Sequence, residues 1–183
     1  TFINILEQCK KYKLPALFEK PLTTSTKFLE NTVGDDYFNK FIDVDYIYLY
    51  SNLWNLFLKN VSLDFSKNIF LEFWSGNNGP ARKNINIFWD WLPHDISMLF
   101  SITNIFDFNV KNITLINDQK GQYYQINLKK SNIDVVINVS NKMNYKMRFC
   151  KIINNKRSMI FDDVLKKAQI DDQYLKFDEH FSN

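Results

Sequence analysis

The amino-acid sequence predicts an α+β fold whose last third is a largely antiparallel sheet. The first observation behind this prediction is a series of five runs rich in β-branched and aromatic residues, separated only by short turns. Connections this short favour antiparallel neighbours, so the runs are expected to form a meander. The five runs are 112–118, 122–130, 133–140, 145–153 and 157–163.

The second observation is the alternation of apolar and polar side chains within these runs. Val135, Ile137 and Val139 alternate with Asp134 and Asn138. A period of two places the three apolar side chains on one side of a strand. The sheet is therefore expected to bury one face and to leave the other face more open.

Helices and shorter strands are expected in front of this sheet. Ile3, Leu6 and Cys9 recur at helical spacing, and Pro15 ends that helix before a short buried strand at 16–18. Further helices are expected at 26–33, 35–42, 52–60 and 93–103, with a weak one at 164–169, and Gly34 is expected to end the first of them. Further strands are expected at 44–51 and 68–76.

Length, composition and charge exclude several classes of protein. The 183 residues suit one domain, or one domain and part of another. Hydrophobic residues make up 45% and aromatic residues 16%, which is enough for a sizeable core and argues against wholesale disorder. The net charge is +3, and lysines are interspersed with acidic residues along the chain. A nucleic-acid-binding protein normally has a concentrated basic face, and this mixed distribution of charge does not indicate one.

The cysteines and the chain ends predict a cytoplasmic fragment. Cys9 and Cys150 form neither a disulfide framework nor a CxxC motif, so each is expected to be a small buried residue. No signal peptide opens the chain, and no apolar run approaches the ~20 residues of a membrane helix. The chain lacks an initiator Met and ends without closing an element, so both ends are expected to be cut.

The stretch "FWDWLPHD" places an acid and an imidazole four positions apart, at Asp90 and His94. If Asp90 caps a helix, Pro93 falls in the first turn, where its missing N–H costs nothing. Side chains at this spacing share one face, and a carboxylate orients a neighbouring imidazole and raises its basicity. Such a histidine can accept a proton from an alcohol. The alternative is that Asp90 only caps the helix and His94 is a partly buried helix residue.

The stretch "FEKPL" places a charged pair at the end of a predicted strand. Glu19 and Lys20 would lie at its carboxyl end, where open α/β sheets bind their ligands. A lysine there can donate to a substrate oxygen and stabilise a developing oxyanion. The alternative is a strand end with solvated charges.

Together these stretches resemble the Gfo/Idh/MocA family of NAD(P)-dependent oxidoreductases over nearly the whole chain. "KLPALFEKPLTTS" is similar to the last nucleotide-domain segment of that family, and "WDWLPHDISML" is similar to its catalytic Asp/His segment, in the branch acting on sugars or sugar nucleotides. The resemblance implies that residues 1–33 are a remnant helix and strand of a Rossmann domain. Residues 34–183 would be a substrate-binding and oligomerisation domain, truncated at its C-terminus, with an open, largely antiparallel sheet and helices on one face.

The resemblance also implies roles for individual residues. Lys20 would contact substrate near the nicotinamide, and Glu19 and Pro21 would shape the turn beside the cofactor, NAD or NADP. His94 would take the hydroxyl proton while a hydride leaves the same carbon for the nicotinamide, and Asp90 would hold the imidazole in place. Lys20 and His94 are therefore expected to converge on one cleft. The implied protein is a homo-oligomer that oxidises or reduces a hydroxyl carbon of a sugar or sugar nucleotide.

The chain departs from the family in its cofactor motif. It has four glycines and no G-x-G-x-x-G, so the pyrophosphate-binding turn would lie before Thr1 and the chain alone should hold NAD poorly. The stretch 43–60 matches weakly, and no substrate residue is assigned there. No metal site is expected, because the two histidines are far apart and no cysteines are paired.

Two other functions stay open. The chain could be a non-catalytic binding or oligomerisation module built on the same open sheet. The second is a nucleic-acid-binding surface on the sheet, and the modest net charge argues against it. Neither nucleic acid nor membrane is expected as a partner. Trp74, Trp89 and Trp91 could stack on a sugar ring, although Trp89 is expected in the core. Asp95 could cap a helix or contact substrate, and the cap is favoured.

Overall fold

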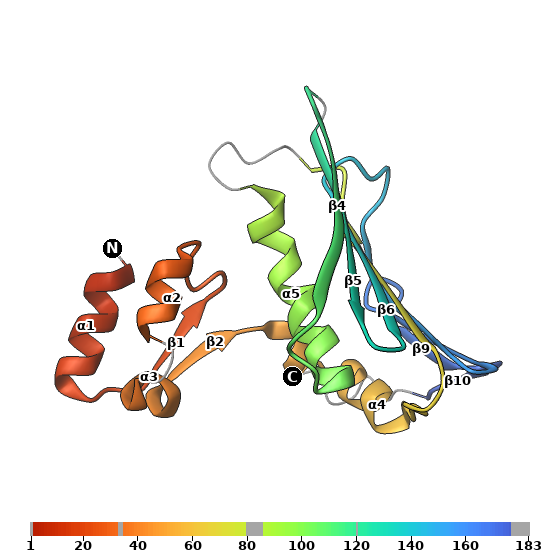
Figure 1. Ribbon diagram of the computed structural model, residues 1–183, viewed down its shortest axis with the longest axis horizontal. Coiled ribbons are helices and arrows are strands. Elements are labelled where there is room, and N and C mark those ends of the chain that lie inside the picture. The colour runs from red at the N-terminus through yellow and green to blue at the C-terminus, as the bar shows by residue number, and fades with distance from the viewer. Residues whose placement is uncertain (1, 33–34, 80–85, 120, 177–183) are drawn as a thin grey trace. The chain divides into compact units, whose positions relative to one another are not determined.

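The computed structural model describes residues 2–32, 35–79, 86–119 and 121–176 (Figure 1). The chain divides into two compact units, Thr1–Tyr46 and Ile47–Asn183. Within these ranges, no helix is both long enough and apolar enough to cross a membrane.

The first unit is small and is built on two parallel strands. The strands are β1 (Ala16–Glu19) and β2 (Ile42–Asp45), and Glu19 lies opposite Asp45 at their carboxyl ends. Three helices accompany them: α1 (Phe2–Tyr12), α2 (Thr26–Thr32) and α3 (Asp36–Phe41). Asp35 caps α3 by accepting hydrogen bonds from two backbone N–H groups of the first turn, and it also pairs with Lys10 of α1. This pairing with Lys10 is the main reason that the pKa of Asp35 is lowered.

The second unit is an eight-stranded sheet with helices on one face. Its helical elements are the 3₁₀ helix η1 (Ile47–Tyr50), α4 (Asn52–Asn60) and α5 (Ile87–Thr103). Its strands are β3 (Ile69–Gly76), β4 (Asn109–Asp118), β5 (Gly121–Lys130), β6 (Ile133–Ser140), β7 (Met147–Asn154), β8 (Arg157–Asp162), β9 (Lys167–Ile170) and β10 (Gln173–Tyr174), in the spatial order β10-β9-β8-β7-β3-β6-β5-β4. The predicted α+β class with a largely antiparallel open sheet is confirmed.

The expected meander is interrupted by one strand. β3 lies between β6 and β7, parallel to the first and antiparallel to the second, so β6 and β7 are not neighbours as expected. The reason lies in the connections. Two residues join β5 to β6 and β7 to β8, which forces direct pairing, whereas the connection 141–146 is long enough to pass over an inserted strand.

Three other expectations were wrong in detail. The predicted strand 44–51 contains only the end of β2, because residues 47–50 turn as η1 before Ser51 caps α4. The weak helix at 164–169 is a turn followed by β9, whose Ala168 and Ile170 are buried. Helix α5 begins at Ile87 and not at Pro93, because Asn86 accepts a hydrogen bond from the backbone N–H of Phe88 (2.9 Å). The other predicted helices and strands are confirmed in position, but β1 is not the buried strand that was expected, because its residues alternate between half-buried and exposed. The expected helix end at Gly34 lies outside the described residues.

The hydrophobic core lies between the sheet and its helices (Figure 1). Trp54 and Phe57 of α4 pack against Phe161 of β8 with ring centroids 4.8 and 5.9 Å apart, and all three side chains are fully buried. Leu99 of α5 is buried over the same face. Burying a large apolar side chain contributes about 1.5–3 kcal/mol, so these contacts hold both helices to one face of the sheet.

The opposite face of the sheet carries half-buried aromatic side chains. Trp74 of β3 stacks on Phe149 of β7 with centroids 6.4 Å apart, and its indole N–H donates to Glu72 (2.7 Å). Tyr123 of β5 donates to Asn138 (2.7 Å) on the neighbouring strand. Helices α4 and α5 and the η1 turn all pack on the other side, so this face is the more open one, as the alternation predicted.

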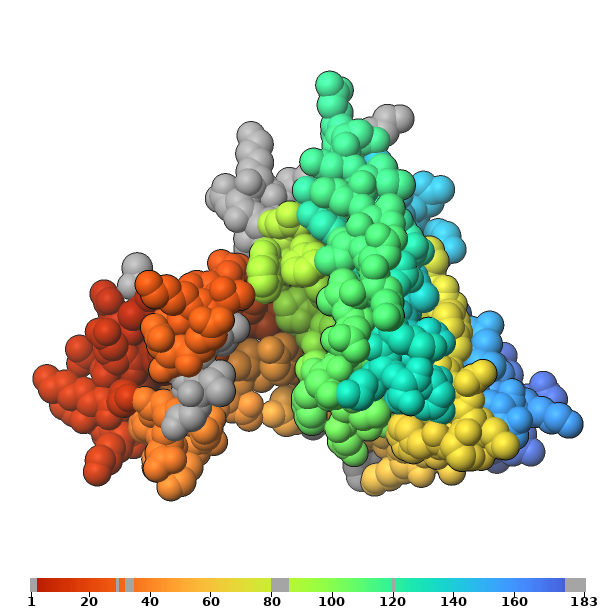
Figure 2. All heavy atoms as spheres, in the orientation of Figure 1, coloured from red at the N-terminus to blue at the C-terminus, as the bar shows by residue number. Residues whose placement is uncertain are grey.

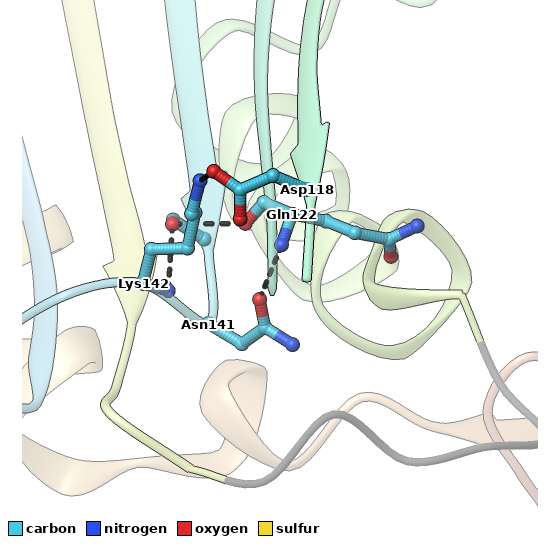
Figure 3. Close-up of polar contacts among 5 residues, drawn as sticks. Asp118, Gln122, Asn141 and Lys142 are labelled. Atoms are coloured by element: carbon cyan, nitrogen blue, oxygen red, sulfur yellow. Dashed lines mark hydrogen bonds and ion pairs between the residues drawn. The ribbon is translucent and has the colours of Figure 1, made fainter. Parts of the chain in front are cut away.

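Polar groups close one end of the sheet, where β5 begins and β6 ends (Figure 3). The backbone N–H of Gln122 donates to Oδ1 of Asn141 (2.6 Å), and Lys142 pairs with Asp118 (2.5 Å). Gly121 has a φ of +139°, and a Cβ there would lie 2.4 Å from the same Asn141 oxygen. This turn therefore requires glycine, and the polar groups drawn serve to close it.

Strand β4 forms one edge of the sheet and is exposed along its whole length (Figure 2). Its pairing with β5 shifts between Val110 and Asn112, which leaves Lys111 as the extra residue of a β-bulge. Exposed apolar side chains follow the bulge at Ile113 and Leu115.

Replacing Gly76 tests the close approach of β3 to β6. A Cβ at this position would lie 2.3 Å from the backbone oxygen of Ser140 and 2.6 Å from Cγ of Met143. We expect Gly76→Ala to lower the free energy of unfolding by about 1–3 kcal/mol, the usual range for overpacking. Gly79→Ala is the matched control, because the atoms nearest to its Cβ belong to the side chain of Asn77 and not to backbone. Equal urea midpoints for the two variants would contradict the pairing of Gly76 with Ser140.

Candidate active site

Helix α5 carries both members of the D-x-x-x-H motif. Asp90 lies in its first turn and accepts a hydrogen bond from the indole N–H of Trp91 (3.2 Å). His94 follows one turn later, so the two side chains share one side of the helix. The expectation that Asp90 caps the helix was wrong, because Asn86 is the cap. Pro93 consequently lies inside α5, where its ring removes one backbone hydrogen bond of the helix.

The imidazole of His94 lies in a mostly buried, aromatic environment. His94 is 6% exposed, and its ring is perpendicular to that of Tyr48 from η1, with centroids 5.0 Å apart. The hydroxyl of Ser97 donates to the backbone oxygen of His94 (2.7 Å). These surroundings hold the imidazole in a site with little access to bulk water.

Next to His94, Asp95 forms a buried ion pair that joins α5 to the sheet. Its Oδ1 accepts a hydrogen bond from Nη1 of Arg148 (2.9 Å), and its Oδ2 accepts one from the hydroxyl of Ser75. Asp95 is 1% exposed and Arg148 is 6% exposed. Burial raises the pKa of the Asp95 carboxyl, while the Arg148 guanidinium and the Ser75 hydroxyl act to lower it. Asp95 is therefore not the cap that the sequence predicted.

Strand pairing explains why two partners meet this carboxylate. Ser75 of β3 lies directly opposite Arg148 of β7 on the face that α5 covers. The guanidinium of Arg148 also lies over the ring of Tyr48 at 4.4 Å and near that of Trp91 at 5.7 Å. The site thus combines one ion pair with two aromatic rings, of which the Tyr48 ring lies against His94.

Sequence reasoning missed Ser75, Arg148 and Tyr48. One signal could have found Arg148: it precedes Cys150 and Ile152 at a spacing of two, so it lies in the inward phase of a strand. Arginine is favoured over lysine in buried ion pairs, and this chain has few arginines among many lysines.

The tryptophans are distributed differently from what was expected. Trp91 lies beside Arg148 in this site, while Trp74 lies on the open face of the sheet. Trp89 is half-buried and packs against Phe88 (5.2 Å), outside the buried core in which it was expected. Cys150 is buried as predicted, and Cys9 is half-buried. Burial and the nearby Asp95 raise the pKa of the Cys150 thiol well above its ordinary value.

The charged pair of "FEKPL" belongs to the first unit. Glu19 is the last residue of β1, and Lys20 follows it directly, so both lie at the carboxyl end of a parallel strand pair as predicted. This is where α/β sheets bind nucleotides. The same chain contains no Gly-rich phosphate turn. The convergence of Lys20 with His94 stays a prediction.

Among the described residues, no group of three or more His, Cys, Asp or Glu side chains could hold a metal ion. The acid–base groups on α5 are the Asp90 carboxylate, the His94 imidazole and the Asp95 carboxylate, which is paired with Arg148 of β7. Such a set can bind a hydroxyl group and exchange a proton with it.

Comparison with solved structures identifies the fold. The chain aligns with a Gfo/Idh/MocA family oxidoreductase from Vibrio cholerae at a TM-score of 0.68 and 13% identity, over 97% of this chain and 59% of the other. The chain has the Gfo/Idh/MocA fold. A UDP-N-acetylglucosamine 3-dehydrogenase from Acidithiobacillus ferrooxidans aligns at a TM-score of 0.77 and 14% identity, over 98% of this chain and 61% of the other.

A dehydrogenase from Clostridium difficile also aligns with the chain, at a TM-score of 0.74 and 12% identity, over 98% of this chain and 60% of the other. The chain therefore spans less than two thirds of the length of these structures. No family model and no curated protein sequence matches it. The resemblance read from the sequence is confirmed as a likeness of fold.

Removing one partner of the buried ion pair tests its contribution to stability. Arg148→Met leaves the Asp95 carboxylate buried and unpaired, so we expect the free energy of unfolding to fall by about 3–5 kcal/mol. The double variant Asp95→Leu with Arg148→Met removes both charges and should recover most of this loss, as measured by urea unfolding. Arg157→Met is the control, because its ion pair with Asp171 is exposed and should matter much less.

Proposed function

We propose that this chain is the substrate-binding part of a Gfo/Idh/MocA-type oxidoreductase. The observation that carries the proposal is the position of Asp90 and His94 on one side of α5, within a fold shared with several dehydrogenases. The reaction would transfer a hydride between NAD or NADP and a hydroxyl carbon. A polypeptide segment outside these 183 residues would supply the pyrophosphate-binding turn, so the chain alone is expected to be inactive.

In this proposal His94 is the general base. Its imidazole takes the proton of the substrate hydroxyl as the carbon–hydrogen bond breaks, and returns it in the reverse reaction. Asp90 lies one turn earlier on the same side of the helix and would hold the imidazole in place. The burial of His94 keeps water away from the proton being transferred.

Lys20 would stabilise the substrate oxygen. Its ammonium group carries the positive charge that a developing alkoxide requires, and it follows a strand end suited to a nucleotide ligand. Glu19 and Pro21 would shape this turn against the cofactor. When bound, the nicotinamide would supply the hydride acceptor.

We propose a sugar or sugar nucleotide as the substrate class. Two features support it: the "PHD" sequence at 93–95, and the likeness of the fold to that of a UDP-N-acetylglucosamine 3-dehydrogenase. Trp91, beside Arg148 and one turn from Asp95, offers an aromatic surface of the kind on which sugars stack. A location in the cytoplasm stays a prediction from the sequence.

Substituting His94 tests the proposal in the complete protein that carries this sequence. A positioned general base contributes about 10²- to 10⁴-fold to the rate, so His94→Ala should lower kcat by that factor and change KM little. The readout is NAD(P)H absorbance with a panel of sugars and sugar nucleotides. His180→Ala, at the other histidine of the sequence, is the control. Undiminished turnover in His94→Ala would show that His94 is not the base.

A second function is favoured by the open face of the sheet. Half-buried aromatic side chains such as Trp74 and Phe149 stack there, on the side opposite α4 and α5. Such a face suits the homo-oligomer contact expected from the sequence. The chain would then serve assembly, either within the enzyme or as a non-catalytic module.

A charge placed on the open face tests this role. We expect Phe149→Lys to shift the protein to a smaller species in size-exclusion chromatography with light scattering, because a lysine ammonium would be buried at the contact. Leu165→Lys is the control, since Leu165 is exposed in the turn after β8. A monomeric wild-type protein, or an unchanged oligomer in Phe149→Lys, would refute the contact.

A further inference from the structure

The side chains of Asp95, Arg148 and Tyr48 contact one another in that order, and this series of contacts ends at the His94 imidazole. The Asp95 carboxylate holds the Arg148 guanidinium at 2.9 Å, and this guanidinium lies over the Tyr48 ring at 4.4 Å. The Tyr48 ring in turn meets His94 at 5.0 Å with an interplanar angle of 85°. All four residues belong to the second unit and come from three elements, α5, β7 and η1.

The far end of this series is fixed by the sheet. Arg148 is directly opposite Ser75 across the β3–β7 pair, and both side chains bond to the same carboxylate. Neither Asp95 nor Arg148 is more than 6% exposed. A guanidinium held in this way has little freedom to move, and a desolvated cation is strongly attracted to an aromatic face.

The near end restrains the histidine. Edge-to-face rings have a preferred geometry, so a rotation about the Cβ–Cγ bond that tilts the plane of the imidazole weakens its contact with Tyr48. Proton transfer requires that one ring nitrogen point at the substrate hydroxyl, and small misplacements are costly to the rate. The orientation of Tyr48 therefore bears directly on the orientation of the proposed base.

We propose that Tyr48, held face-on by the Asp95–Arg148 pair, is a positioning residue that fixes the His94 imidazole for proton transfer. This inference rests on the proposed function, because it assigns Tyr48 a role only through His94. The ring of Tyr48, and not its hydroxyl, provides the restraint. Tyr48→Phe should consequently preserve the restraint on the His94 imidazole, whereas Tyr48→Leu should remove it.

Kinetics of the complete protein give the first test. Tyr48→Leu should lower kcat by about 10- to 100-fold with KM little changed, because orientation is lost while substrate contacts remain. Tyr48→Phe should restore turnover to near the wild-type rate. The folded double variant Asp95→Leu with Arg148→Met keeps the Tyr48 ring but removes its support. Its kcat should lie between those of Tyr48→Leu and Tyr48→Phe. A Tyr48→Leu protein with the wild-type kcat would overturn the inference.

A spectroscopic test needs no activity. The chain has two histidines, so ring signals of His94 can be assigned by comparison with His180→Gln. Nuclear Overhauser contacts are expected between the rings of Tyr48 and His94, retained in Tyr48→Phe and weakened several-fold in the double variant. Their absence from the wild-type chain would overturn the positioning role.

The two proposals fail in distinguishable ways. If His94→Ala abolishes turnover while Tyr48→Leu is fully active, only the positioning role is wrong. If His94→Ala itself retains full turnover, the proposed function is wrong and the positioning role falls with it.

Discussion

The contact between the Asp95 carboxylate and its two partners on the sheet is the constraint on which the rest of the second unit depends. A carboxylate that is 1% exposed is tolerated only where its charge is paired and its oxygens accept hydrogen bonds. Ser75 and Arg148 meet this demand together because β3 and β7 are neighbours. Had β7 paired with β6 in a simple meander, Ser75 would not lie beside Arg148. The insertion of β3 between β6 and β7 thus brings together the two partners of the carboxylate that joins α5 to the sheet.

This dependence explains which parts of the fold could be predicted from the sequence. Each strand of the last third is marked by local signals, namely alternation and turns of a few residues, and these signals need no knowledge of distant segments. The position of β3 depends on parallel pairing with β6, which lies far later in the chain. No local pattern encodes such a pairing. The same limit applies to η1, whose aromatic composition is that of a strand although the cap of α4 forces the chain to turn.

The residues of the candidate site likewise fall into those marked by a local sequence signal and those brought together only by the fold. Asp90 and His94 were recognisable because their spacing within one helix is itself the signal, and Lys20 because it directly follows a strand. Arg148 is 53 positions from Asp95, and nothing in its immediate neighbours separates a buried arginine from a solvated one except its phase in the strand. The residues that support an active-site group from behind come from other elements. They became visible only once the sheet order was known.

The bulge in β4 has a consequence for the behaviour of the chain in concentrated solution. An edge strand of this length offers unpaired N–H and C=O groups to any extended peptide, and Ile113 and Leu115 add apolar surface to that edge. The extra residue, Lys111, kinks the strand and places a charge where an incoming strand would have to align. A bulge of this kind is one of the features that make an edge strand a poor template for adding further strands.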